Sequence, residues 1–217
     1  PQGTWTVNEF TNAMVALGEL RTDPEVPIVR ADLYSPGWIL MLFGSYGGQP
    51  IDFSTDPVTY NLTTPENMSA MQQVINYIND GLIQYDGLRE RDNYFFGASP
   101  DNSYIIINIL SDLNMQMQFA DLSGDLELQL VTFPNGTYMP VAYSIGMAHI
   151  KSDSPYIQEC YDWIQTIASH PEMFDGMPAQ QRHFSDPALI AQEGENVVSF
   201  YEQLTTSLTA SNIMALP

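Results

Sequence analysis

Apolar residues recur at helical spacing in several separate stretches, and the clearest of these stretches follows Pro65. Thr64, Pro65 and Glu66 form a helix-start signal: a hydroxyl that can cap, a proline suited to the first turn, and an acid near the positive end of the helix dipole. Gly81 stands where a helix commonly ends. The pattern predicts a helix between Pro65 and Gly81. Its expected buried face carries Met68, Met71, Val74, Ile75, Ile78 and Leu82.

The same spacing predicts three further helices. Near the start of the chain, Thr6 and Glu9 form a capping box, in which each side chain accepts a hydrogen bond from a free backbone N–H of the first turn. A second helix is expected from Pro155 to Ser169, with Ser154 as its N-cap, and a third from Val197 to Leu208. The expected buried faces are Val7, Phe10, Ala13, Met14, Leu17 and Leu20; Ile157, Cys160, Tyr161, Ile164, Ile167 and Ala168; and Val198, Tyr201, Leu204 and Leu208.

Strands are predicted at Ile28–Val29, Leu126–Phe133 and Val141–Ile150, where apolar and β-branched residues cluster or alternate. The segment Tyr104–Met117 favours a helix, whereas the short apolar run Ile39–Phe43 does not separate a helix from a strand. We expect the last of the three strands to contact the helix that follows it, so that the two form one strand–helix unit. Strands that alternate with helices indicate an α/β fold.

The surface charge is strongly negative, and it excludes two classes of partner. The 217 residues include 26 acidic and 6 basic side chains, which gives a net charge of −20. Such a surface repels nucleic-acid phosphates and anionic lipid headgroups, so neither is an expected partner. Hydrophobic residues make up 44% of the chain and aromatic residues 12%, which suffices for a globular core. No apolar run has the length of a membrane-spanning helix.

The sequence contains no catalytic or metal-binding motif. Cys160 is the only cysteine, so it cannot form an internal disulfide, and its place on the apolar face of a helix predicts burial. The stretch Asp121–Glu127 loosely resembles a calcium loop, but Leu126 and Thr132 stand where that loop requires glycine and glutamate. The three histidines lack metal-ligand spacing, and no glycine-rich phosphate loop or serine-nucleophile elbow occurs. We therefore expect no catalytic residue, no metal and no cofactor.

Several stretches carry a resemblance to a known family. They are Thr4–Phe10, similar to a "TW-x-EF" helix start; Gly47–Gly48 with Asn61–Glu66 and Asp80–Leu82, similar to a "GG…tpe…L…G" block; Pro134–Thr137, similar to a "P-x-G" turn; Met139–Pro171, similar to a return segment; and Gly176–Arg182, similar to "G-x-lPa-x-r". In this order they resemble family 1 extracellular solute-binding proteins, the two-lobed receptors of bacterial ABC importers. The resemblance covers most of the chain and includes no catalytic motif.

The resemblance implies an α/β fold of the type II periplasmic-binding-protein kind, with a mixed sheet flanked by helices. In that family most of a first lobe precedes the "TW-x-EF" helix, so we expect an incomplete two-lobe architecture in these residues. Residues 1–140 would form the second lobe, residues 141–177 the strand–helix unit that returns to the first lobe, and residues 178–217 a helical segment that packs back on the second lobe. The resemblance also favours a helix for Ile39–Phe43.

The expected ligand site combines aromatic rings with a few polar groups. Tyr34, Trp38 and Tyr46 lie near proline or glycine, and Tyr143 and Ser144 lie on the strand that in the family passes between the lobes. Aromatic rings pack on the C–H faces of sugars, whose hydroxyls suit neutral or acidic partners. Each ring taken alone is better explained as core, but we expect at least one in the cleft. Trp38 is the first choice, and its ring should be partly exposed in an open lobe.

Three further side chains carry separate expectations. Arg182 is the one arginine with a positional argument for ligand binding, although a surface ion pair among so many carboxylates explains it better. Trp5 and Trp163 lie in or next to helices that have a core to face. We therefore expect both tryptophans to be packing residues.

These inferences predict the extracellular substrate-binding component of an ABC transporter, which captures a sugar or similar neutral polyol by hinge closure of two lobes. Its partners would be that small molecule and the permease subunits. It would lie at the extracellular face of the membrane or in the periplasm, with membrane attachment only through a lipid anchor outside this chain. A non-transport cell-surface recognition module on the same scaffold is the first alternative. A carbohydrate-active enzyme with paired carboxylates is the second.

Overall fold

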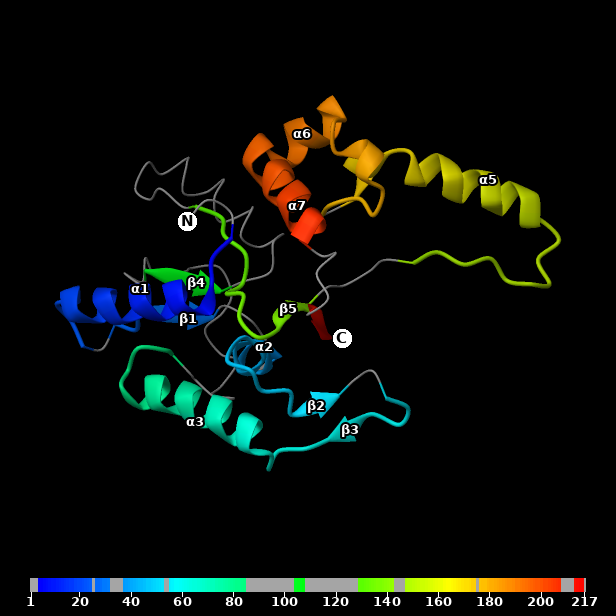
Figure 1. Ribbon diagram of the computed structural model, residues 1–217. Helices are drawn as coiled ribbons and strands as arrows, with labels where there is room; N and C mark the ends of the chain where they lie inside the picture. The colour runs from blue at the N-terminus through cyan, green and yellow to red at the C-terminus, as the bar shows by residue number, and fades with distance from the viewer. Residues whose placement is uncertain are drawn as a thin grey trace, which may run out of the picture. The chain divides into compact units, whose positions relative to one another are not determined.

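The computed structural model describes residues 4–24, 26–31, 37–52, 55–84, 104–107, 129–142, 147–174, 176–207 and 213–216 (Figure 1). The chain divides into two compact units. The first unit comprises Pro1–Ile109, Val131–Ala142 and Ala210–Pro217, and the second comprises Leu110–Leu130 and Tyr143–Thr209. Helices and strands both occur along the chain, so the fold is mixed α/β, as predicted.

The first unit contains both helices and short strands. They are α1 (Val7–Leu20), β1 (Val29–Ala31), α2 (Gly37–Ser45), β2 (Ile51–Asp52), β3 (Thr59–Tyr60), α3 (Pro65–Asn79), β4 (Ile105–Ile107), β5 (Met139–Ala142) and β6 (Ile213–Leu216). The described strands pair two by two: β1 with β4 and β5 with β6 in parallel, and β2 with β3 antiparallel. Val29 pairs with Ile105, and Met139 pairs with Ile213. No helix in the described ranges is long and apolar enough to cross a bilayer.

The N-terminus of α1 is capped as predicted. The Thr6 hydroxyl accepts a hydrogen bond from the Glu9 N–H (3.2 Å), and the Glu9 carboxylate accepts one from the Thr6 N–H (2.7 Å). The hydrogen bonds from the backbone and then the side chain of Thr6 lower the pKa of the Glu9 carboxyl below its ordinary value. The charge of Glu9 therefore contributes to the cap.

We predict that Glu9→Gln removes a pH-dependent contribution to stability. The folded pKa of Glu9 lies below its unfolded value, so the carboxylate stabilises the fold fully above the unfolded pKa and loses this effect as the pH falls through the folded pKa. The difference in melting temperature between the two proteins should therefore be present near neutral pH and shrink below about pH 4. Thermal melts at several pH values measure it, and a difference that does not change with pH would contradict the role of the charge.

Helix α3 begins and ends as predicted, and most of its expected apolar face lies against the core: Val74 is buried, and Met71, Ile78 and Leu82 pack against the core cluster. The Thr64 hydroxyl accepts a hydrogen bond from the Asn67 N–H (3.2 Å), and Gly81 has φ +68°, a left-handed conformation that suits glycine. Met68 and Ile75 are 52% and 42% exposed, contrary to expectation. The buried positions are Asn67, Ala70 and Val74. Polar Asn67 also faces inward, where its amide bonds to the backbone of neighbouring segments.

The core of the first unit is built from α1, α2, α3 and the segments around β1. Its buried members are Phe10, Met14, Ile28, Val29, Trp38, Leu42, Phe43, Val74 and Ile83. Trp5 packs edge-on against Phe10, with ring centroids 5.2 Å apart, and its indole N–H donates to the Thr132 carbonyl (2.7 Å). Trp5 is therefore a packing residue, as predicted. The apolar run Ile39–Phe43 lies in α2, so the expected helix there is confirmed.

The regular elements described in the second unit are all helices. It contains α5 (Ile157–Ala168), the short 3-10 helices η2 (Pro171–Met173) and η3 (Gln181–His183), α6 (Pro187–Glu193) and α7 (Glu195–Ser207). Leu189, Val197 and Val198 are buried, and α6 contacts α7. The rings of Phe184 and Tyr201 pack edge-on with centroids 5.4 Å apart. This shared packing explains why residues 178–207 group together within the second unit.

The units differ in part from the expected domains. The chain crosses between the units at residues 109/110, 130/131, 142/143 and 209/210, and the third of these crossings lies close to the expected boundary at residues 140 and 141. Residues 178–207 were expected to pack back on the second lobe, but they group with α5 in the second unit. From this C-terminal region only Ala210–Pro217 belongs to the first unit, where β6 pairs with β5.

The return strand is shorter than predicted, and the helix after it starts later. β5 ends at Ala142, and residues 147–150 have no regular secondary structure. The prediction of a strand to Ile150 is therefore wrong over residues 147–150, which counts against the family resemblance in this segment. No described strand pairs with these residues, and apolar composition alone does not form a ladder. α5 starts at Ile157 because the Ser154 hydroxyl accepts a hydrogen bond from the Tyr156 N–H (3.2 Å) and forms a turn ahead of the helix.

Two other predicted elements differ from the structure. Ile105–Ile107 forms β4, not the start of a helix, because these β-branched residues pair with β1. The rest of the Tyr104–Met117 prediction lies outside the described residues. The strand expected at Leu126–Phe133 is not formed over residues 129–133, and its first residues also lie outside the described ranges.

Candidate ligand-binding site

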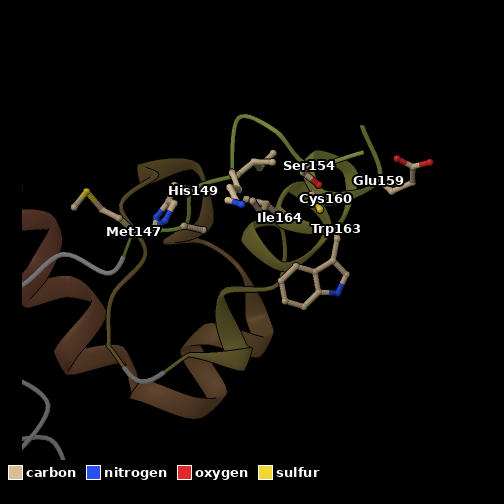
Figure 2. Close-up of a pocket in the computed structure, with 10 residues that line it drawn as sticks. Met147, His149, Ser154, Glu159, Cys160, Trp163 and Ile164 are labelled. Atoms are coloured by element: carbon tan, nitrogen blue, oxygen red, sulfur yellow. The ribbon is translucent and has the colours of Figure 1, made fainter. Parts of the chain in front are cut away.

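An open groove runs between residues 147–151 and α5 in the second unit (Figure 2). Its volume is about 570 Å³, which falls within the size range of small-molecule sites. Figure 2 shows Met147 toward one end of the groove and Glu159 toward the other, with Trp163 projecting from α5. The lining residues are Met147, Ala148, His149, Ile150, Lys151, Ser154, Glu159, Cys160, Trp163 and Ile164.

Helix α5, which forms one side of the groove, has little cover from the described residues. No residue of α5 is buried, and the side chains of Ile157, Tyr161 and Trp163 are 51%, 49% and 66% exposed. The prediction that Trp163 is a packing residue is therefore wrong for this structure. Cys160 is half-buried instead of buried. The amphipathic spacing of α5 was identified correctly, but the described residues supply no partner that covers this face.

The charged and imidazole side chains at the groove, those of His149, Lys151 and Glu159, are exposed to solvent. The Lys151 ammonium lies 3.0 Å from the Asp153 carboxylate, with side chains that are 81% and 68% exposed, so this ion pair adds little stability. The Ser154 hydroxyl already bonds the Tyr156 N–H. Within the ranges that the structure describes, no group of three or more His, Cys, Asp and Glu side chains could hold a metal ion. The groove therefore suits apolar contact better than bond-making chemistry.

Trp38, the first choice for ligand contact, is a core residue. It lies in α2 and is 5% exposed, so the expected partial exposure is wrong. The cause is the phase of the helix: Trp38 and Leu42 are one turn apart and point to the same core. The ring offers no free surface to a ligand in this conformation. Tyr34, Tyr143 and Ser144 lie outside the described residues.

Tyr46 lies in a partly buried chain of hydroxyl groups between α1 and α3. Its hydroxyl is 2.7 Å from the Thr11 hydroxyl, which donates to the Val7 carbonyl (2.8 Å), so Tyr46 is the donor to Thr11. Its ring centroid lies 6.0 Å from that of Tyr77, whose hydroxyl accepts a hydrogen bond from Gln73 (3.1 Å). Burial raises the pKa of the Tyr46 hydroxyl above its ordinary value, so the group stays neutral. These contacts give Tyr46 a structural role.

Arg182 lies in η3 and is exposed to solvent. Its Nε–H donates to Nε2 of the neighbouring His183 (3.2 Å). Arg182 is not among the residues that line the groove of α5. The structure therefore brings neither Arg182 nor the described aromatic candidates, Trp38 and Tyr46, to this groove.

A second feature of interest is the junction at which several family-like stretches of the first unit meet. The Asn135 N–H donates to the Trp5 carbonyl (3.0 Å), and the Asn135 carbonyl accepts from the Val7 N–H (2.8 Å). The Ser45 hydroxyl at the end of α2 donates to the Pro134 carbonyl (2.6 Å), and Ser45 is 1% exposed. The start of α1, the end of α2 and the "P-x-G" turn therefore form one hydrogen-bonded junction.

A buried amide links the glycine pair after α2 to the start of α3. The Asn67 side chain is almost fully buried, since the residue is 4% exposed. Its carbonyl oxygen accepts from the Gln49 N–H, and its NH₂ group donates to the carbonyls of Gln49 and Asn61. A buried amide is stable only when its polar atoms are paired in this way. Asn67 therefore fixes the loop that carries Gly47–Gly48 against α3.

The residues of the groove were not predicted as a site from the sequence. The available signal was the strong amphipathic pattern of α5, whose apolar face needs a partner somewhere. Composition did not single out Met147, His149 or Trp163, because such residues are more often core. Asn67 and Ser45 were missed for a related reason. A polar residue that is buried and hydrogen-bonded to the backbone cannot be distinguished in the sequence from a polar residue on the surface.

The chain was compared with protein families, with individual proteins and with solved structures. No protein-family model, curated protein or solved structure matches the chain.

Proposed function

We propose that this chain belongs to the extracellular substrate-binding component of an ABC transporter, which captures a sugar or similar neutral polyol. One observation carries the proposal. Three family-like stretches that lie far apart in the sequence, Thr4–Phe10, Gly47–Gly48 and Pro134–Thr137, are neighbours at one packed junction: Asn135 bonds the backbone of Trp5 and Val7, and a Cβ on Gly47 would lie 3.2 Å from the Thr137 hydroxyl. Random local similarity to family motifs has no reason to place them together, whereas a shared lobe architecture does.

The finer fold in this proposal is a type II periplasmic-binding-protein lobe. The "TW-x-EF" stretch contains the cap of α1, the glycine pair follows the end of α2, and the "tpe" stretch starts α3. Family-like residues thus stand at the ends of elements, where capping and turns demand particular residue types. This agreement between local chemistry and element boundaries supports the lobe assignment.

The two-lobe architecture is supported by the uncovered face of α5. An amphipathic helix is stabilised mainly by burial of its apolar face, so the exposure of Ile157 and Tyr161 on that face, and of Trp163 at its edge, supports a further surface that covers them in the complete receptor. In the proposed protein that surface is the first lobe, to which residues 141–177 return. Ligand binding between two lobes would favour the closed state that the permease subunits recognise.

The choice of a neutral ligand rests on charge. A net charge of −20 gives the surface a negative potential that repels anionic solutes, so phosphorylated or carboxylated ligands are disfavoured. Sugars carry no charge, and their hydroxyls can donate to the acidic and amide oxygens in which this chain is rich. Such a receptor would act at the extracellular face of the membrane or in the periplasm, held by a lipid anchor outside this chain.

We predict that the 217-residue chain alone binds sugars no better than in the millimolar range. A small ligand requires burial of most of its surface, and one lobe encloses only part of it. Calorimetric titration of this chain and of the complete gene product against a panel of neutral mono- and oligosaccharides tests the proposal. The complete product should bind at least one of them with micromolar affinity.

Each other outcome of that titration favours a different conclusion. Micromolar binding by the 217 residues alone would contradict the need for a second lobe. No binding by the complete product to any sugar in the panel would favour a non-transport recognition module on the same scaffold. Turnover of a chromogenic glycoside by the complete product would favour a carbohydrate-active enzyme.

We also predict that Trp163 becomes shielded in the complete product. Trp163 is 66% exposed in the chain described here, whereas Trp38 is 5% exposed. Acrylamide is the suitable quencher because it is neutral, and iodide would be repelled by the net negative charge. Quenching of the 217-residue chain should fall strongly in Trp163→Phe, and this difference should largely disappear in the complete product.

Trp38→Phe provides the matched control for the quenching experiment. It removes a buried indole, so the emission that remains should be quenched more efficiently on average than in the wild type. If acrylamide quenches Trp163 equally in the short and the complete proteins, the side of α5 that carries Trp163 does not pack against another lobe.

A further inference from the structure

We draw no further inference here: the strongest candidate, the open apolar groove between residues 147–151 and α5, belongs to the site already described, and nothing in the described part of the chain shows a second occupant for it.

Discussion

Trp38→Ala should lower the free energy of unfolding by about 3–5 kcal/mol, the range typical for removal of a large buried aromatic ring. Trp38 is 5% exposed and belongs to the same buried cluster as Phe10, Met14 and Leu42. Close-packed neighbours fill the resulting cavity only in part, so the cavity adds to the lost burial of the ring. Urea denaturation followed by circular dichroism measures the change without relying on the tryptophan that is removed.

Tyr60→Ala is the matched control for this experiment. Tyr60 is a large aromatic residue of the same unit, but it is 72% exposed, so its truncation should change the free energy of unfolding by no more than about 0.5 kcal/mol. Equal effects of the two substitutions would mean that Trp38 is not a core residue. A variant Trp38→Ala that keeps its fold but loses sugar affinity would instead restore Trp38 to the ligand site.

The start and end of helices could be predicted from sequence because capping depends on residues within a few positions of each other. Thr6 with Glu9 and Thr64 with Asn67 make their capping hydrogen bonds three residues apart. The same locality explains the correct placement of Gly81 at the end of α3. The α/β class followed from these elements and their order.

Burial could not be predicted in the same way, because it depends on partners that are distant in the chain. Trp38 follows a turn sequence and yet is core, whereas Trp163 lies on an amphipathic helix and is exposed. The sequence-based prediction for each indole depends on its immediate neighbours. Its burial or exposure depends instead on whether a segment distant in the sequence packs against it. The candidate site therefore could not be located from aromatic residues alone.

The positions and lengths of strands could not be predicted from the sequence for a related reason. Ile105–Ile107 is a strand because β1 lies beside it, and no described strand lies beside residues 147–150. The backbone hydrogen bonds of a β-sheet are made between strands. A run of apolar residues therefore forms a strand only where a neighbouring strand pairs with it.

Gly136→Ala should destabilise the first unit by about 3 kcal/mol or more. A Cβ at Gly136 would fall on the carbonyl group of Ser45 and would also press on the Val7 side chain. The Ser45 carbonyl accepts a hydrogen bond from the Thr137 N–H (3.2 Å), and the Ser45 hydroxyl donates to the Pro134 carbonyl (2.6 Å). Neither the end of α2 nor the turn can therefore withdraw without breaking hydrogen bonds of a buried group.

Gly81→Ala separates this collision from the general cost of replacing a glycine. Gly81 lies in the same unit and has φ +68°, and a Cβ there would approach only the Arg21 guanidinium, at 3.5 Å or more. Its cost should come from the left-handed backbone alone, about 1–2 kcal/mol. Urea denaturation should rank Gly136→Ala as clearly the more destabilised variant. Losses of equal size would show that the turn moves away from α2 at little cost, and that the junction of the family-like stretches is looser than its hydrogen bonds indicate.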